Sequence, residues 1–116
     1  MKLLNFILRK DHFDVVHSVG DDVENHEGIE YLISELNEAQ QNVVEGFRSL
    51  VISKIPQGEE LQYCVAQTDY SQHGSQERLV IIDDTQPFST IINIDELTEQ
   101  EMLVYTECKN LAISFI

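Results

Sequence analysis

The sequence has few positively charged residues and no tryptophan. Its 116 residues include 7 Lys and Arg against 21 Asp and Glu, which gives a formal net charge of -14. A surface of this sign repels phosphate backbones and anionic lipid headgroups. We therefore expect no direct binding to nucleic acid or to a membrane, and we expect that a basic protein would be attracted.

Long hydrophobic runs are also missing. No apolar segment approaches the roughly 20 residues that are needed to cross a bilayer. Residues 3–8 are largely apolar, but this run ends at Arg9 and Lys10, and no cleavage site for a signal peptide follows it. These features predict a cytoplasmic protein.

Cysteine is scarce, and the two thiols, Cys64 and Cys108, are far apart in the sequence. This spacing fits neither a disulfide framework nor a zinc-binding motif, and the four histidines have no ligand spacing with the cysteines. Both cysteines fall in segments that are expected to be buried, where Cys packs as a small apolar residue. We expect free, buried thiols and no bound metal.

Motifs for catalysis or cofactor binding are weak. The five glycines are scattered singly, so no glycine-rich phosphate-binding loop is present. Asp83 and Asp84 follow a hydrophobic strand, where a magnesium ligand could lie, but a role in a hairpin turn is favoured. Cys64 could be a nucleophile in a triad assembled by the fold, although a packing role is favoured. We predict no catalytic residue and no cofactor.

Length and composition predict one domain over residues 1–116. The chain is 42% hydrophobic and 24% charged, as in ordinary globular domains, and it is too short for two domains of common size. No internal repeat, low-complexity tract or linker is evident. One core without disulfides or metals should therefore suffice for folding.

Local patterns predict strands over 3–8, 13–19, 61–66, 79–83 and 88–94, with the last two forming a hairpin. Gly20 to Gly28 is polar and acidic and is predicted to be a loop. The tail from residue 111 to residue 116 is apolar, and its end is predicted to add a last strand.

Two helices are predicted, at about 38–54 and 98–110. The first begins after Asn37 with Gln40 at the third helical position, and the second has the capping box of Thr98 and Glu101. Residues 29–36 fit either a strand or a separate short helix. The fold class is therefore α+β, a single domain with a mainly antiparallel sheet on which the two principal helices pack.

The acidic residues are concentrated in one part of the chain. Between Lys10 and Arg48 there is no Lys or Arg but there are ten acids, and a second stretch of like sign extends from Asp95 to Glu101. A loop tyrosine is the aromatic residue most suited to anchor an interface. The predicted partner-binding residues are Asp21, Asp22, Glu24, Glu27, Glu30, Glu35, Glu38 and Tyr70, with help from the second stretch.

These features predict a non-enzymatic binding or inhibitor protein whose acidic face captures a basic protein partner, such as a nuclease toxin or another nucleic-acid-binding protein. Immunity proteins of bacterial toxins and proteins that mimic the charge of DNA share this size and charge, a likeness of composition only. The alternatives are a small enzyme or ligand-binding domain with an unrecognised site, and an accessory subunit of an assembly. The acidic charge could also serve only solubility.

Overall fold

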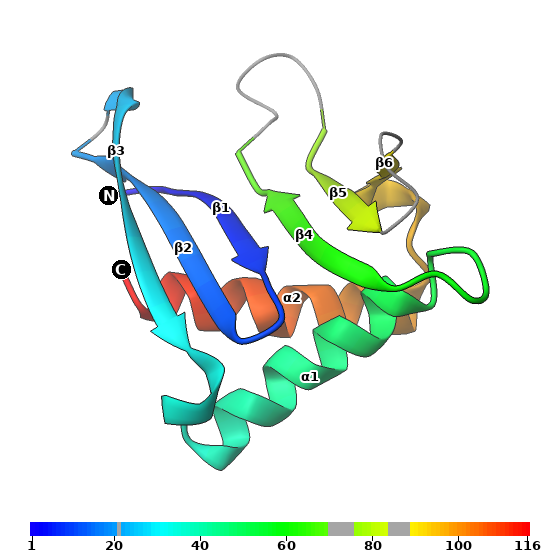
Figure 1. Cartoon of the computed structure of the whole chain (residues 1–116). Coiled ribbons are helices and arrows are strands. Elements are labelled where there is room, and N and C mark those ends of the chain that lie inside the picture. Colours follow the sequence, from blue (N-terminus) through cyan, green and yellow to red (C-terminus); the bar gives the residue numbers. More distant parts are fainter. Residues whose placement is uncertain (21, 70–75, 84–88) are drawn as a thin grey trace.

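The protein folds as a six-stranded antiparallel sheet with two helices packed on it, seen in the computed structural model in Figure 1. The structure describes residues 1–20, 22–69, 76–83 and 89–116. The strand order in the sheet is β3-β2-β1-β4-β5-β6. The strands are β1 (Leu3–Leu8), β2 (His12–Val19), β3 (Asp22–Leu32), β4 (Leu61–Gln67), β5 (Arg78–Asp83) and β6 (Ser89–Asn93).

Both principal helices, α1 (Glu38–Ile52) and α2 (Glu99–Ser114), lie on the same side of the sheet and contact each other (Figure 1). A short 3₁₀ helix precedes each of them: η1 (Ile33–Glu35) and η3 (Ile94–Glu96). The core lies between the sheet and the helices. At its centre the ring of Phe6 lies 5.3 Å from that of Phe47 and 5.9 Å from that of Tyr105.

The predicted fold class and both predicted helices are confirmed. Each helix begins with a complete capping box, Asn37 with Gln40 in α1 and Thr98 with Glu101 in α2. The five predicted strands are present within one or two residues at each end, and β5 and β6 pair as the predicted antiparallel hairpin.

The predicted loop from Gly20 to Gly28 is wrong, because β3 begins at Asp22 and pairs with β2 at Asp22 and again from His26 to Leu32, with a register shift between these two parts. Residues 29–36, for which the sequence left a strand and a short helix as alternatives, contain both: β3 ends at Leu32 and η1 follows. β3 is an edge strand whose residues are mostly exposed, so its polar sequence lacks the apolar alternation that marks half-buried strands.

The predicted last strand at the C-terminus is also wrong, since α2 continues to Ser114. Ala112 is buried, and Leu111 and Phe115 pack against the core. These apolar side chains therefore face the sheet from a helix, not from a seventh strand.

The structure reveals an internal repeat that the sequence analysis missed. β1, β2, β3, η1 and α1 form a first unit, and β4, β5, β6, η3 and α2 form a second unit with the same order and pairing. In both units the first strand has a register shift near its start, at Leu3/Asn5 and at Leu61/Tyr63. The two units share one sheet and one core, so they make a single domain.

Equivalent hydrogen bonds support the repeat. The amide of Ile33 donates to the carbonyl of Asp11 at 2.9 Å, and that of Ile94 donates to Glu77 at the same distance. The clearest sequence match aligns residues 33–53 with 94–114, in which eight of the 21 positions are identical. The identical pairs are Ile33/Ile94, Glu35/Glu96, Leu36/Leu97, Glu38/Glu99, Val43/Val104, Leu50/Leu111, Ile52/Ile113 and Ser53/Ser114.

The first strands of the two units, β1 and β4, pair antiparallel at the centre of the sheet. Ile7 and Val65 occupy equivalent positions and lie opposite each other, so an approximate two-fold axis passes between them. The axis relates α1 to α2 as an antiparallel pair. Consistent with this, Lys54 just beyond α1 forms a 2.6 Å ion pair with Glu101 in the first turn of α2.

The two helix caps provide a matched test of this symmetry. We expect Asn37→Ala and Thr98→Ala each to lower the free energy of unfolding by about 1 kcal/mol, because each removes an acceptor for a helix N-terminal amide. The caps belong to different helices, so the loss of unfolding free energy in the double variant should equal the sum of the two single losses. Urea unfolding measures this, with Asn37→Ser and Thr98→Ser as controls that keep the cap. Loss at one cap only would show that the units differ in helix stability.

Candidate functional site

The predicted partner-binding acids lie along one edge of the sheet. Asp22, Glu24, Glu27 and Glu30 are exposed on β3, and Glu35 and Glu38 follow in η1 and at the start of α1. They are not all on one face. Glu27 lies opposite the buried His17, on the helix side, whereas Glu30 lies opposite Asp14 on the other side of the sheet. The acids therefore surround the β3 edge.

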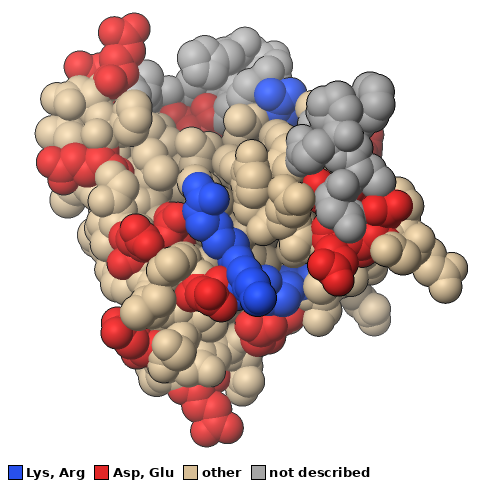
Figure 2. All heavy atoms as spheres, in the orientation of Figure 1, with Lys and Arg blue, Asp and Glu red and all other residues tan. Residues whose placement is uncertain are grey.

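Most of the few bases are already used in ion pairs. Arg9 pairs with Asp14, Arg48 with Glu45, Lys54 with Glu101, Lys109 with Glu77 and Lys2 with Asp69. Among the six described acids of the β3 edge, only Glu30 makes an ion pair, with His12 at 3.1 Å. Figure 2 shows Asp and Glu along the left and lower margins and again at the right, with Lys and Arg between them.

The second acidic stretch does not join this edge. Asp95 and Glu96 follow β6, which is at the opposite edge of the sheet from β3. Glu101 is engaged by Lys54, whose hydrogen bond lowers the pKa of that carboxyl. Asp95 and Glu96 therefore lie apart from the acids of the β3 edge, and help from Asp95 to Glu101 in partner binding stays a prediction. Asp21 and Tyr70 lie outside the described residues.

Both thiols are free and buried, as expected. Burial raises the pKa of Cys64 to about 12, and burial, with a smaller contribution from Cys64, raises the pKa of Cys108. The thiolate is the nucleophilic form of cysteine, so neither residue is activated at neutral pH. Their role is packing between the sheet and the helices.

Asp83 ends β5 and is buried on the helix side of the sheet, while Asp84 lies outside the described residues. In the described ranges no three His, Cys, Asp or Glu side chains are grouped to hold a metal ion. The buried Asp83 occupies the position that is equivalent to His17 of the first unit, which is also buried. Both units thus have a buried polar side chain near the end of the second strand.

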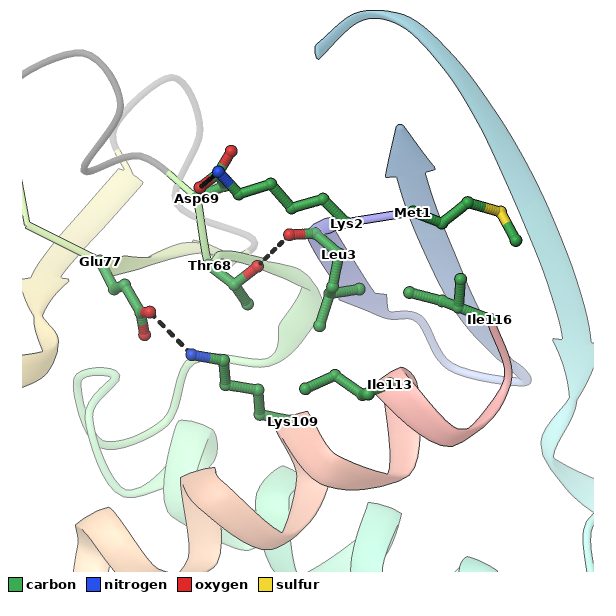
Figure 3. Close-up of a pocket in the computed structure, with 9 residues that line it drawn as sticks. All are labelled: Met1, Lys2, Leu3, Thr68, Asp69, Glu77, Lys109, Ile113 and Ile116. Carbon is green, nitrogen blue, oxygen red and sulfur yellow. Dashed lines mark hydrogen bonds and ion pairs between the residues drawn. The ribbon is translucent and has the colours of Figure 1, made fainter. Parts of the chain in front are cut away.

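A pocket of about 650 Å³ lies between the start of β1, the end of β4 and the last turns of α2 (Figure 3). Its apolar lining comes mainly from Leu3, Ile113 and Ile116. Two Lys–carboxylate pairs line it as well, Lys2 with Asp69 at 3.2 Å and Lys109 with Glu77 at 2.7 Å.

Most polar groups around this pocket are engaged with one another, although the buried Oδ2 of Asp69 has no hydrogen-bond partner among the described residues. The Tyr105 hydroxyl donates to Glu77 at 2.8 Å, and burial together with this carboxylate raises the pKa of the tyrosine. The Thr68 hydroxyl donates to the carbonyls of Leu3 and Leu4 at 3.0 Å. The contacts around the pocket therefore connect β1 to β4 and α2. The two Lys and two carboxylate side chains that line it balance in charge, so its charge favours no ligand of either sign.

The first unit has a comparable contact between its helix and the connection of its first two strands. Arg48 occupies the position in α1 that Lys109 has in α2, and its guanidinium donates to the carbonyls of Arg9 and Lys10 at 3.1 Å. The connection between β1 and β2 is three residues, 9–11, whereas ten residues, 68–77, separate β4 from β5. The pocket lies where the second unit carries this longer connection.

No protein-family model, curated protein or solved structure matches this chain. Within the described part of the chain, neither α1 nor α2 has the length and apolar character of a membrane-spanning helix.

Proposed function

We propose that this protein is a non-enzymatic binding protein that captures a basic protein partner through the carboxylates of the β3 edge. The observation that carries the proposal is the run of exposed acids on one sheet edge, where only one of the six described members makes an ion pair. Asp21 and Tyr70 remain predicted contacts of the same interface.

The physical basis is long-range attraction followed by desolvated contact. Clustered carboxylates raise the rate at which a basic surface is encountered, and unpaired charges at an edge have no internal partner to lose on binding. Proteins that bind nucleic acid present basic surfaces to phosphate, so an acidic edge can occupy such a surface. A nuclease or another nucleic-acid-binding protein is accordingly the proposed partner, in the manner of an immunity protein or a DNA mimic.

The acidic residues of β3 also suit an edge strand because they oppose pairing with other chains. Exposed edges can pair with strands of other chains, and charged residues on them prevent such association. Prevention of aggregation requires only repulsion between copies, whereas partner capture requires that specific carboxylates determine affinity.

The net charge of -14 and the free thiols agree with a proposed location in the cytosol, away from nucleic acid and membrane surfaces.

The first experiment is affinity purification with the immobilised full chain at low ionic strength, followed by mass spectrometry. The charge-reversed variant Asp22→Lys plus Glu24→Lys serves as the bait for comparison. The proposed partner is a basic protein that the wild type retains and the variant does not.

With that partner in hand, we expect Asp22→Lys plus Glu24→Lys to slow association about tenfold at low salt and to change dissociation less. The matched control is Asp95→Lys plus Glu96→Lys at the opposite edge, which changes the net charge by the same amount, from -14 to -10. Stopped-flow or surface-based kinetics at several salt concentrations measure both. Equal effects of the two variants, or binding that ignores salt, would contradict capture at the β3 edge.

A further inference from the structure

The helices cover one face of the sheet, and no described helix or strand covers the other face, here called the outer face. One row of neighbouring side chains crosses all six strands on this face. The cross-strand pairs link the row from β3 to β6, in the order Glu30, Asp14, Ile7, Val65, Val80 and Ile91.

This row is acidic at one end and apolar at the other. Val65 and Val80 are half-buried, and Ile91 is 51% exposed. Tyr63 and Ile82, which pair with each other on the same face, widen the apolar half, and the Arg9 guanidinium lies 5.3 Å from the centroid of the Tyr63 ring. On the acidic half, Arg9 neutralises Asp14, while the edge beyond carries Asp22 and Glu24 without ion pairs among the described residues.

The internal repeat supplies a comparison within the same chain. The approximate two-fold axis exchanges the members of three pairs in this row: Ile7 with Val65, Asp14 with Val80, and Glu30 with Ile91. Ile7 and Val65 are apolar in both units, whereas the positions of the other two pairs hold carboxylates in the first unit and apolar side chains in the second. Because both units have the same fold, the fold itself does not require apolar residues there.

An antiparallel sheet with one solvated face normally alternates apolar and polar residues along each strand. β5 departs from this rule, since Leu79, Val80, Ile81 and Ile82 form a continuous apolar run typical of a strand that is covered on both faces. Contiguous exposed apolar surface beside polar residues marks interaction sites. The second unit thus has a partly exposed apolar surface on its outer face, centred on the exposed Ile91.

We infer that the outer face of β4, β5 and β6, together with the adjoining carboxylates of β2 and β3, is the docking surface for a basic protein whose contact region carries apolar side chains beside its Lys and Arg residues. The inference rests on the proposed function, because the sign of the partner's charge follows from it. It adds the place of the interface core, which the acidic edge alone does not define.

Charge distinguishes this occupant from a second copy of the chain. Two copies would each bring a net charge of -14 to the interface, and like charges at an interface oppose association. A partner with basic residues beside an apolar centre matches the apolar half of the row and the carboxylates of Asp22 and Glu24 at the β3 edge beyond it, since Asp14 and Glu30 already pair with Arg9 and His12. Self-association therefore becomes an outcome that the test must detect.

The test compares two synthetic peptides of equal length and equal positive charge on the isotopically labelled full chain. In one peptide the lysines alternate with leucines, and in the other they alternate with serines. We expect the leucine peptide to bind about tenfold more tightly, since its apolar side chains are desolvated on the apolar half. Its amide chemical-shift changes should centre on Val65, Val80 and Ile91.

The decisive variant copies the first unit onto the second, Val80→Asp plus Ile91→Glu. It adds two negative charges, so by electrostatics alone both basic peptides should bind more tightly. We expect instead that the advantage of the leucine peptide disappears. Circular dichroism and urea unfolding check the fold, and Ile91→Glu alone serves if the double variant unfolds, because Ile91 is more than half exposed.

Each outcome bears on the inference. Equal binding of the two peptides to the wild type, or an unchanged advantage of the leucine peptide in the variant, would overturn it. A dimer in sedimentation velocity at high salt that Val80→Asp plus Ile91→Glu abolishes would also overturn it, since the face would then join two copies.

The same peptides separate this inference from the proposed function. Asp22→Lys plus Glu24→Lys should weaken both peptides, and that result tests the acidic edge alone. If this reversal weakens both peptides while the Val80 and Ile91 changes affect neither, the proposed function stands and the docking surface is overturned. If the reversal has no effect while the apolar changes abolish leucine-peptide binding, the acidic edge fails, and with it the basic character of the partner.

Discussion

Replacing Phe6 with alanine is expected to lower the free energy of unfolding by about 3–5 kcal/mol. The ring is fully buried in β1 at the centre of the sheet. Its centroid lies 5.3 Å from that of Phe47, 5.8 Å from that of Phe13 and 5.9 Å from that of Tyr105. One truncation therefore opens a cavity at the junction of the sheet with both helices, in a domain whose total stability is expected to be about 5–15 kcal/mol.

The repeat provides the matched control. Cys64 occupies the equivalent position in β4 and is equally buried, but Cys64→Ala removes a single sulfur atom. We expect it to cost about 1 kcal/mol, because less apolar contact is lost. Urea unfolding of both variants gives the comparison. Similar losses for Phe6→Ala and Cys64→Ala would show that the aromatic cluster around Phe6 does not dominate the core.

Local signals explain why both helices and most strands could be predicted from the sequence. The caps at Asn37 and Thr98 are encoded within four residues each, and the buried strands alternate or run apolar over short stretches. β3 could not be predicted this way. Its exposed edge position places no demand on side-chain polarity, and its strand conformation follows from hydrogen bonds to β2, which no local pattern records.

The repeat escaped sequence analysis for two physical reasons. The connections between the first two strands differ in length, three residues against ten, so no single spacing aligns the two units. The core positions also differ in size: where one unit has the larger side chain, the other has the smaller. These pairs are Phe6/Cys64, Phe47/Cys108, Val44/Tyr105 and Val51/Ala112. Cores tolerate such exchange when the total volume is kept, but the sequence identity is lost.

The candidate site was predictable in its chemistry and not in its arrangement. The sequence shows that acids are concentrated between Lys10 and Arg48, and the structure puts four of them, Asp22, Glu24, Glu27 and Glu30, on the edge strand β3. The separation of Asp95 and Glu96 from that edge depends on strand order, which residue composition does not encode. The apolar run in β5 was visible from the start, but only the comparison of equivalent positions shows that its outward-facing Val80, equivalent to Asp14, is not required by the fold.

Alkaline pH should destabilise the protein strongly. The native pKa of Cys64 is raised to about 12 and that of Cys108 is also raised, both mainly by burial, from an unfolded value of 9.0. A native pKa above the unfolded one means that this stabilisation is complete below pH 9 and is lost as pH rises toward the native pKa. At pH 11, about two pH units above the unfolded pKa, each thiol lowers the free energy of unfolding by about twice 1.36 kcal/mol. We therefore expect the two thiols together to reduce the free energy of unfolding by about 5 kcal/mol relative to pH 8.

The experiment is urea unfolding at pH 8 and pH 11 in the presence of a reductant that keeps the thiols free. The control is Cys64→Ala plus Cys108→Ala, which keeps burial and Glu77, the main causes of the raised pKa of Tyr105, and the alkaline increase in negative charge. The decrease between the two pH values should be smaller in this variant by about 5 kcal/mol, because no thiol remains to ionise on unfolding. Equal decreases in the two proteins would mean that the thiols ionise as readily in the folded chain as in the unfolded one. That result would contradict their burial in a dry core between the sheet and the helices.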